Sequence, residues 1–221
     1  MSIAMTSRVI LKAGAMAAAL IVGLPSAAAA ASPTTTCDGP LAAGTYLKVV
    51  VPADAFCFSE GSVTIRGGVN IGPGATLVLG SEDSPGNTAT ISGGVRATNA
   101  RSVQIHFATI QGKVDIQGGS GPFGGPFDVT WNTIEDSQIN GAVTIEGYDG
   151  FWQGFIRNHV NGAVRLNDNV LADPDGNEYV TNTINGSLSC FGNDPAPQIG
   201  DSEGSPNQVH GAVRGQCAEI D

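Results

Sequence analysis

A seven-residue pattern of apolar and polar positions recurs along the chain in the form [Ile/Val]-x-Gly-x-[Val/Leu]-x-apolar. Apolar residues and the glycine occupy alternate positions, and this period of two is typical of a strand with one buried face. Seven copies, spaced 19 to 29 residues apart, are IRGGVNI (65–71), ISGGVRA (91–97), IQGKVDI (110–116), INGAVTI (139–145), VNGAVRL (160–166), INGSLSC (184–190) and VHGAVRG (209–215). The uneven spacing indicates one variable loop in each repeat.

Each repeat is too short to bury its apolar face alone, so neighbouring repeats must stack. Short β units about 24 residues apart, without helical periodicity between them, predict an all-β fold, a parallel β-helix of about seven coils. We expect the repeat glycine at a bend between sheets, where a side chain would crowd the interior. A second strand is predicted before most repeats, in ATLVLG (75–80), VQIHFA (103–108), FDVTW (127–131), GFIRN (154–158) and EYVTN (178–182).

The alternative fold is an antiparallel β-sandwich with the repeats as hairpins. Asn-Gly steps at 140–141, 161–162 and 185–186 favour it, because Asn-Gly is a strong hairpin signal. No complementary strand flanks these steps at a constant distance, so the stacked arrangement is preferred.

The two ends of the repeat region carry a resemblance to known proteins. At one end it rests on CDGPLAAGTYLKVVVPADAFC (37–57), and at the other on NTINGSLSCFGNDPAP (182–197) with GQC (215–217). With the repeats, these segments make the chain resemble a right-handed parallel β-helix of the pectate-lyase-like kind, and in particular small secreted bacterial β-helix proteins of uncharacterised function. The resemblance implies the fold and export, and it carries over no functional residue.

The N-terminus has the features of a signal peptide. Arg8 and Lys12 precede the apolar run AGAMAAALIVGL (13–24), and small residues follow in PSAAAAASP (25–33). We expect a signal peptide at 1–31, an N-terminal cap at 32–60, and a β-helix domain at 61–221 that ends in a disulfide cap. The run is too short for a stable membrane anchor, so the prediction is a secreted protein, free or loosely associated with the cell wall.

Charge excludes several classes of partner. The formal net charge is −10, and loss of Arg8 and Lys12 with the signal peptide makes it −12. Nucleic acid and acidic membranes are therefore not expected as partners, because binding them requires a basic surface.

Four cysteines in an exported chain predict two disulfides. Of the three pairings, we prefer Cys37–Cys57 and Cys190–Cys217, because each closes a loop of about one repeat at one end of the chain. We expect these two bonds to hold the first and last coils, whose strand edges are otherwise unpaired.

Stacking turns equivalent repeat positions into columns. The position before the glycine reads Arg66, Ser92, Gln111, Asn140, Asn161, Asn185, His210, and its amides predict a hydrogen-bonded ladder rather than a ligand-binding stripe. The position after the glycine reads Gly68, Gly94, Lys113, Ala142, Ala163, Ser187, Ala212. This small-residue face fits a crowded sheet, or a second copy of the chain, or a glycan.

Aromatic and acidic residues gather in the loops of residues 118–179. Aromatic faces beside carboxylates suit sugar stacking and hydroxyl hydrogen bonding; the alternative is that the rings pack together to seal the loops. The candidate ligand-binding residues are Phe123, Phe127, Tyr148, Asp149, Phe151, Trp152 and Asp168.

The segment DPDGNE (173–178) resembles the start of a calcium loop, with Asp173, Asp175 and Asn177 as ligands and Asp168 nearby. The twelfth position of an EF-hand loop would be Ile184, which cannot bind calcium. A turn is the simpler interpretation, and no cofactor other than a loose Ca²⁺ site is expected.

No catalytic signature stands out. A glycosidase needs two carboxylates, and Glu135, Asp136, Glu146 and Asp149 lie near the aromatic loops. A lyase would need a basic residue beside calcium-binding acids, for which only Arg157 and Arg165 lie close in sequence. His106, His159 and His210 lie in or beside predicted strands, and no catalytic residue is assigned.

The sequence therefore predicts a non-enzymatic exported β-helix with a structural or surface-interaction role, self-association included. The alternative is a protein that binds or cleaves a cell-wall or extracellular polysaccharide through the 118–179 loops, in the second case as a polysaccharide lyase or glycoside hydrolase.

Overall fold

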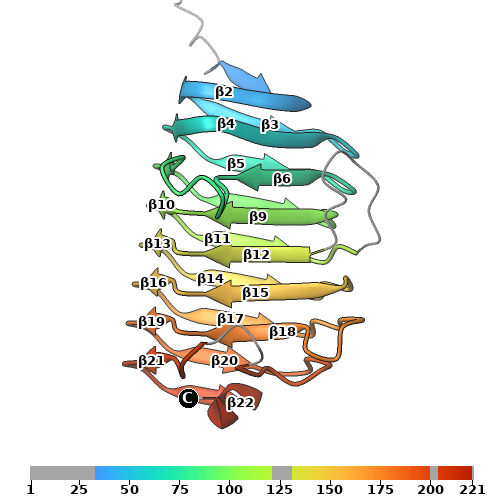
Figure 1. Cartoon of the computed structure of the whole chain (residues 1–221), viewed down its shortest axis with the longest axis vertical. Helices are drawn as coiled ribbons and strands as arrows, with labels where there is room; N and C mark the ends of the chain where they lie inside the picture. Colours follow the sequence, from blue (N-terminus) through green and yellow to red (C-terminus); the bar gives the residue numbers. More distant parts are fainter. Residues whose placement is uncertain (1–32, 121–130, 200–203, 221) are drawn as a thin grey trace, which may run out of the picture. The chain divides into compact units, whose positions relative to one another are not determined.

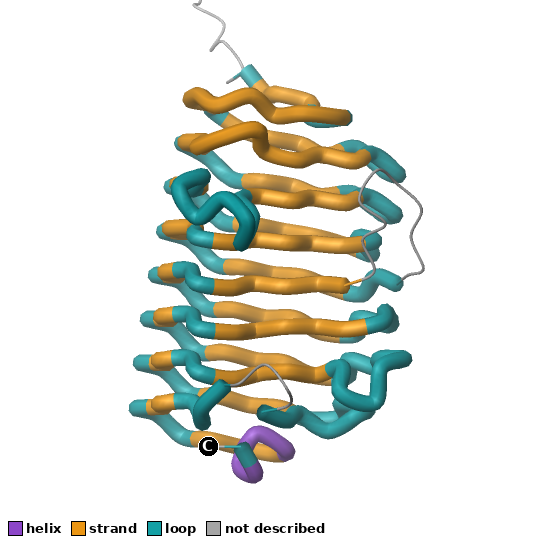
Figure 2. Tube along the Cα trace, in the orientation of Figure 1, coloured by secondary structure: helices purple, strands orange, loops and turns teal. Residues whose placement is uncertain are grey.

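The fold is built almost entirely from short parallel strands stacked in layers (Figures 1 and 2). A computed structural model describes residues 33–120, 131–199 and 204–220. The predicted signal peptide at 1–31 lies outside the described residues. All described residues belong to one compact unit, Ser32–Asp221.

One sheet contains nine strands, each paired in parallel with the next. In spatial order they are β1 (Thr34–Thr36), β3 (Lys48–Val51), β5 (Val69–Ile71), β8 (Val95–Thr98), β11 (Val114–Gln117), β14 (Val143–Glu146), β17 (Val164–Asn167), β20 (Leu188–Cys190) and β22 (Val213–Gly215). Seven of them follow a repeat glycine. β1 and β3 come earlier, so the predicted cap at 32–60 continues the same stack.

The second sheet contains thirteen strands and divides at its longest member, β4 (Phe56–Ile65), which also pairs with β2 (Gly39–Tyr46). The N-terminal half of β4 pairs with β6 and the C-terminal half with β7. One branch is β6 (Thr76–Leu79), β9 (Ser102–His106), β12 (Trp131–Glu135), β15 (Trp152–Ile156) and β18 (Asn177–Val180). The other is β7 (Ala89–Ile91), β10 (Ala108–Ile110), β13 (Gln138–Ile139), β16 (His159–Val160), β19 (Thr183–Ile184) and β21 (Gln208–Val209).

These parallel pairings give a β-helix-like solenoid and exclude the antiparallel sandwich for the described residues. Most of the predicted second strands are found near their expected positions. FDVTW (127–131) is an exception, because the described strand runs from Trp131 to Glu135 and residues 127–130 lie outside the described part.

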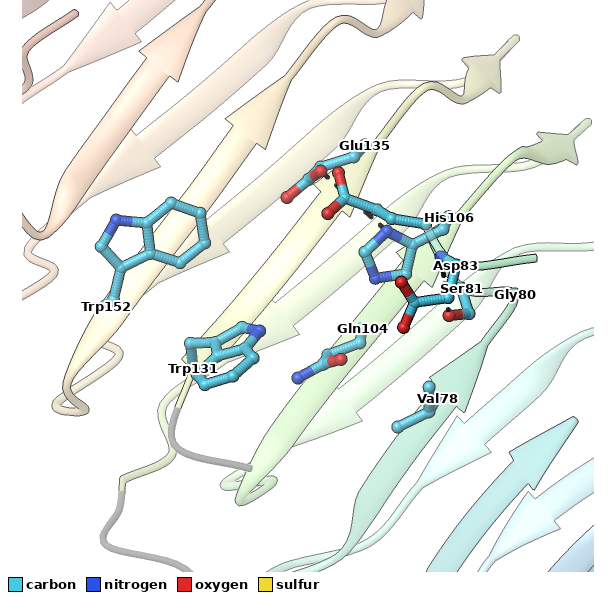
Figure 3. A pocket seen from close by; sticks show the side chains of 10 residues that line it. Val78, Gly80, Ser81, Asp83, Gln104, His106, Trp131, Glu135 and Trp152 are labelled. Carbon is cyan, nitrogen blue, oxygen red and sulfur yellow. Dashed lines mark hydrogen bonds and ion pairs between the residues drawn. The ribbon is translucent and has the colours of Figure 1, made fainter. Parts of the chain in front are cut away.

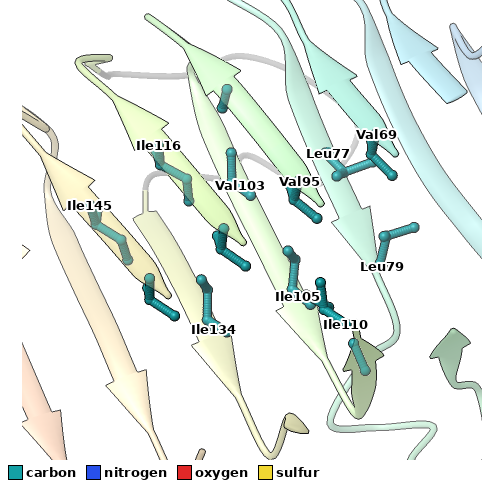
Figure 4. Close-up of a cluster of buried hydrophobic side chains, with 14 of the residues drawn as sticks. Val69, Leu77, Leu79, Val95, Val103, Ile105, Ile110, Ile116, Ile134 and Ile145 are labelled. Carbon is teal, nitrogen blue, oxygen red and sulfur yellow. The ribbon is translucent and has the colours of Figure 1, made fainter. Parts of the chain in front are cut away.

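The core lies between the sheets and follows the predicted alternation. Ile139, Val143 and Ile145 are buried in one repeat and Val160, Val164 and Leu166 in the next. Figure 4 shows such aliphatic side chains from successive strands pointing into the same interior. Each repeat thus buries its apolar face against the layers above and below it.

The repeat glycines lie in the bends between the second sheet and the first, as predicted, but for a different steric reason. A Cβ added at Gly162 would lie 2.5 Å from the carbonyl oxygen of Gly141 and 2.6 Å from the amide nitrogen of Ala142. Real Cβ atoms do not approach backbone this closely. The crowding therefore comes from the adjacent layer and not from the interior.

The predicted amide ladder is present on the surface. Asn140 donates to Gln111 over 2.7 Å, Asn161 to Asn140 over 2.6 Å, and Asn185 to Asn161 over 2.7 Å. This column is therefore engaged along the stack, as the structural interpretation requires.

The predicted disulfides Cys37–Cys57 and Cys190–Cys217 are both formed. The first joins Cys37, which directly follows β1, to β4, and the second joins β20 to the short 3₁₀ helix η1 (Gln216–Glu219). Among the described residues, no helix has the length and apolar character needed to cross a membrane.

Candidate functional site

A cleft of about 350 Å³ opens on the outer face of the branch formed by β6, β9, β12 and β15. Residues from these strands and from the loop after β6 line it. They are Val78, Gly80, Ser81, Glu82, Asp83, Gln104, His106, Trp131, Glu135 and Trp152.

Parallel register brings these residues together from distant parts of the sequence. Trp131 is paired with Trp152, and His106 with Glu135, on adjacent strands. Alternate residues of a strand share one face, so the indoles, Gln104 and the acid–imidazole pair all face outward. Figure 3 shows the two indoles at one end of the cleft, His106, Glu135 and Asp83 at the other, and Gln104 between.

At the aromatic end, the indoles of Trp131 and Trp152 lie on the outer face of β12 and β15. The Trp131 residue is 38% exposed and Trp152 is half-buried. A Cβ added at Gly154 would collide with the Trp152 ring, so the glycine lets this indole lie against the sheet. The two rings offer apolar faces of the kind on which sugars stack.

The middle of the cleft contains buried polar atoms that the described protein leaves unpaired. Gln104 and His106 are each 7% exposed, and neither Gln104 Nε2 nor His106 Nδ1 has a hydrogen-bond partner among the described residues. An unsatisfied buried polar group is costly, and such groups in native proteins usually mark a place for water, an ion or a ligand.

The acidic end is organised by one guanidinium. Arg157 donates through Nε and Nη2 to Asp136, each over 2.8 Å, and through Nη2 to Glu82 and Glu135, each over 3.1 Å. Asp136 and Arg157 both have positive φ, 49° and 55°, at equivalent turns that follow β12 and β15. Stacking of these turns is what places the two side chains together.

Burial changes the acid–base properties of this end. Burial and a hydrogen bond with Glu82 raise the pKa of Glu135 to about 7. The same hydrogen bond lowers the pKa of Glu82, and burial lowers the pKa of His106. Near pH 7 the Glu135 carboxyl is therefore partly protonated, whereas the lowered pKa values favour an ionised Glu82 and a neutral His106.

Of the candidate ligand-binding residues that the structure describes, only Trp152 lines this cleft. Tyr148 belongs to the core, since it is fully buried and its hydroxyl donates to the carbonyl of Arg101 over 3.3 Å. Asp149 and Phe151 are exposed but lie outside the lining. Phe123 and Phe127 lie outside the described residues.

The structure does not gather the proposed calcium ligands. Asn177 is buried, with its amide committed to Asn169, Pro195 and the Tyr179 hydroxyl. Asp173 caps the amide of Asp175 within its own turn. Asp168 is exposed on a different turn, and within the described ranges these acids form no group of three with ligand atoms close together.

Sequence reasoning missed Glu82, Gln104 and Trp131 as site residues, although a signal was present for two of them. Trp131 and Trp152 each lie ten residues before a repeat glycine, and His106 and Glu135 each lie six residues before one. Gln104 lies eight residues before Gly112, and Gly154 lies eight residues before Gly162. The two therefore occupy the same position in layers that are two apart in the stack. Equal offsets predict adjacent positions in a stack; Glu82 lies in an irregular loop and has no such signal.

The small-residue face carries a shallow hollow of about 200 Å³ over β14, β17 and β20, lined in part by Ala142, Ala163 and Ser187. It contains fewer chemically distinctive groups than the cleft.

Comparison of the chain with protein-family models, with curated proteins and with solved structures found no match, so the interpretation of the cleft rests on its geometry.

Proposed function

We propose that this is an exported protein that binds a neutral glycan in the cleft on β6, β9, β12 and β15. The observation that carries the proposal is the juxtaposition of two outward-facing indoles, Trp131 and Trp152, with unpaired polar atoms of Gln104 and His106. Aromatic faces stack on the apolar faces of sugar rings, and amide and imidazole groups hydrogen-bond hydroxyls.

The size of the surface suits part of a chain molecule. Trp131 and Glu135 stand at opposite ends of one strand, about 13 Å apart at about 3.3 Å per residue. The cleft extends across the outer face of four neighbouring strands, with the indoles at one end (Figure 3). A cleft of this extent with stacking groups at one end fits a segment of a polysaccharide.

Charge selects the class of glycan. Glu82, Glu135 and Asp136 contact the guanidinium of Arg157, Asp83 also lines the cleft, and the whole chain has a formal net charge of −10. Acidic polysaccharides such as polyuronates would be repelled from this surface. Neutral polysaccharides would not, and they are the class proposed.

Binding fits the geometry better than hydrolysis. Glycosidases separate their two carboxyl groups by about 5–9.5 Å to flank the scissile bond. Glu82 and Glu135 are instead hydrogen-bonded to each other. A pair in such close contact leaves no room for a glycosidic bond between them.

The test is binding of the full exported chain to insoluble cellulose and xylan, with polygalacturonate as the acidic comparison. We expect retention on at least one neutral polymer and none on polygalacturonate. Trp131→Ala and Trp152→Ala should each weaken binding by at least about ten-fold, since stacking of a ligand ring on an aromatic side chain contributes on the order of 1–3 kcal/mol.

Two further variants sharpen the test. Gly154→Ala keeps both indoles but displaces the Trp152 ring, so it should weaken binding as well. Phe191→Ala removes an aromatic ring that is 50% exposed away from the cleft, and it should bind like the wild type. Equal binding by all variants, or preference for polygalacturonate, would refute the proposal. No binding together with concentration-dependent self-association would favour the structural role instead.

We also propose a right-handed solenoid with about one coil per glycine repeat, secreted after removal of residues 1–31. Crossovers between parallel strands are right-handed in nearly all known cases, and the disulfides fit an oxidising compartment. Mass spectrometry of the exported protein should give an N-terminus near residue 32.

A further inference from the structure

We propose that Glu82, His106 and Glu135 form a binding site for one divalent transition-metal ion, with zinc the best match. This inference uses the same His106 imidazole as the glycan proposal but does not require that a glycan binds. The three residues come from successive layers: the loop after β6, the end of β9 and the end of β12. Side-by-side register of His106 and Glu135 provides two of the ligands on a rigid sheet.

The third ligand, Glu82, lies just after a tight turn at Gly80. Gly80 follows β6 with a φ of 75°, and a Cβ there would collide with the carbonyl oxygen of His106. Only glycine therefore lets the chain turn this close to β9. Two residues later, Glu82 places its carboxylate beside the imidazole of His106 and the carboxylate of Glu135.

The candidate ligand atoms are close enough for one ion. One atom from each residue lies within 4.8 Å of the other two, and His106 Nδ1 is 4.0 Å from Glu135 Oε2. Zinc bonds of about 2.0–2.2 Å place tetrahedral ligands about 3.4 Å apart, so closure requires small side-chain movements. Glu82 is exposed and can supply them.

The imidazole gives an independent sign of a missing partner. His106 is 7% exposed and its Nδ1 has no hydrogen-bond partner in the described part of the chain. The atom faces Glu135 at a distance too long for a hydrogen bond. A metal ion between them would satisfy the nitrogen and both carboxylates at once.

The local charge matches a divalent ion. Glu82, Glu135 and Asp136 together with Arg157 carry a net charge of −2 when all three carboxyl groups are ionised. Arg157 contacts all three carboxylates and thereby fixes their orientation from the outer side. Asp83 also lines this end of the cleft and adds to its negative potential.

The donor set favours zinc over calcium or magnesium. Imidazole is a common ligand of zinc, copper and nickel, whereas calcium and magnesium prefer sites made of oxygen atoms alone. One nitrogen and two carboxylates leave room for water in the fourth position of a zinc site. That position would face the cleft.

The experiment is isothermal titration of the full exported chain, stripped with EDTA, with ZnCl₂, CaCl₂ and MgCl₂ in turn. We expect saturable binding of one zinc per chain and none of the other two ions under the same conditions. His106→Ala and Glu82→Gln should each weaken zinc binding by at least about ten-fold. Because Glu82 lies in an exposed loop, its variant retains the fold even if replacement of His106 does not.

Matched controls separate this site from incidental zinc binding. His159→Ala and Glu146→Gln alter the same residue types elsewhere and should bind zinc like the wild type, as should Trp131→Ala. NMR of the imidazole nitrogens should show zinc shifting Nδ1 of His106 and no other histidine. Absence of zinc binding, binding unaffected by Glu82→Gln, or loss of binding in His159→Ala would each overturn the proposal. Because Trp131→Ala tests the glycan site, the two proposals can fail separately.

Discussion

At the scale of single residues, the repeat glycines show how tightly adjacent layers are packed. Gly162 has no positive φ that would require glycine; it is needed because a Cβ would enter the backbone of the layer beneath. The obstacle is backbone, which cannot move aside as a flexible side chain can. Substitution therefore has to separate two layers locally or bend the turn.

We predict that Gly162→Ala lowers the free energy of unfolding by about 1–3 kcal/mol, the usual cost of overpacking. Urea denaturation followed by circular dichroism measures this cost. Gly86→Ala is the matched control, because a Cβ there meets nothing within 4 Å and φ is not in the left-handed region. Its effect should stay within about 0.5 kcal/mol. Equal costs at the two positions would contradict the packing explanation.

At the scale of the structural element, asparagines join the layers in more than one column. The predicted surface ladder passes through Asn161, whereas a buried ladder passes through Asn158 and Asn182, in the turns that follow β15 and β18, and through Asn207, just before β21. Asn182 donates to the Phe155 carbonyl over 2.6 Å and to Asn207 over 2.8 Å, and it accepts from the Asn158 amide over 2.9 Å. The buried column thus accepts hydrogen bonds from backbone amides of the turns and donates to strand carbonyls.

The two ladders should differ in their contribution to stability. Asn182→Ala leaves the backbone amide of Asn158 buried and unpaired, at a cost of about 1–3 kcal/mol, and also removes the buried hydrogen bonds to the Phe155 carbonyl and to Asn207, each contributing about 0.5–1.5 kcal/mol. We expect a loss of at least about 3 kcal/mol. Asn161→Ala removes exposed hydrogen bonds that water can replace, so its loss should not exceed about 1 kcal/mol. Denaturant titration of both variants checks the order; a larger loss for Asn161→Ala would contradict it.

At the scale of the whole described unit, stability depends on how the stack ends. An interior layer contacts layers on both sides, whereas the last layers contact one. Cys37–Cys57 joins the short connection between β1 and β2 to β4 at one end, and Cys190–Cys217 joins β20 to η1 at the other. Each bond therefore restrains layers that packing alone holds less firmly.

We predict that replacing Cys190 and Cys217 by alanine lowers the free energy of unfolding by roughly 3–4 kcal/mol, from the loop entropy of a 27-residue separation. Hydrogen exchange should rise first in β22 and η1 and remain slow in β11 and β14. Uniformly faster exchange in every layer would show that the bond acts on the stack as a whole.

Much of the fold was predictable because the same pattern of glycine and apolar residues recurs along the chain. A glycine that recurs at 112, 141 and 162 between apolar positions requires stacking, and stacking predicts parallel pairing and the surface amide ladder. The buried asparagine ladder was missed because Asn158 and Asn182 read as loop residues. Their burial depends on turns of positive φ that local sequence does not reveal.

The candidate site was less predictable. Counting backward from the glycines would have paired Trp131 with Trp152 and His106 with Glu135, since layers repeat by position and not by residue type. The aromatic loops instead suggested Tyr148 as a sugar-binding residue. Its aromatic ring suits such a site, but its side chain is buried in the core. Residue type alone does not distinguish an exposed ring from a buried one.

By itself, the sequence determined the repeat, the parallel stacking, the end disulfides and a net negative charge. These follow from periodicity and charge, which are properties of the chain as written. The tertiary structure decided which polar groups are buried together, and so brought Glu82, His106 and Glu135 into one group from three layers. Loop closure and burial depend on the packed neighbours, and no local pattern of residues specifies them.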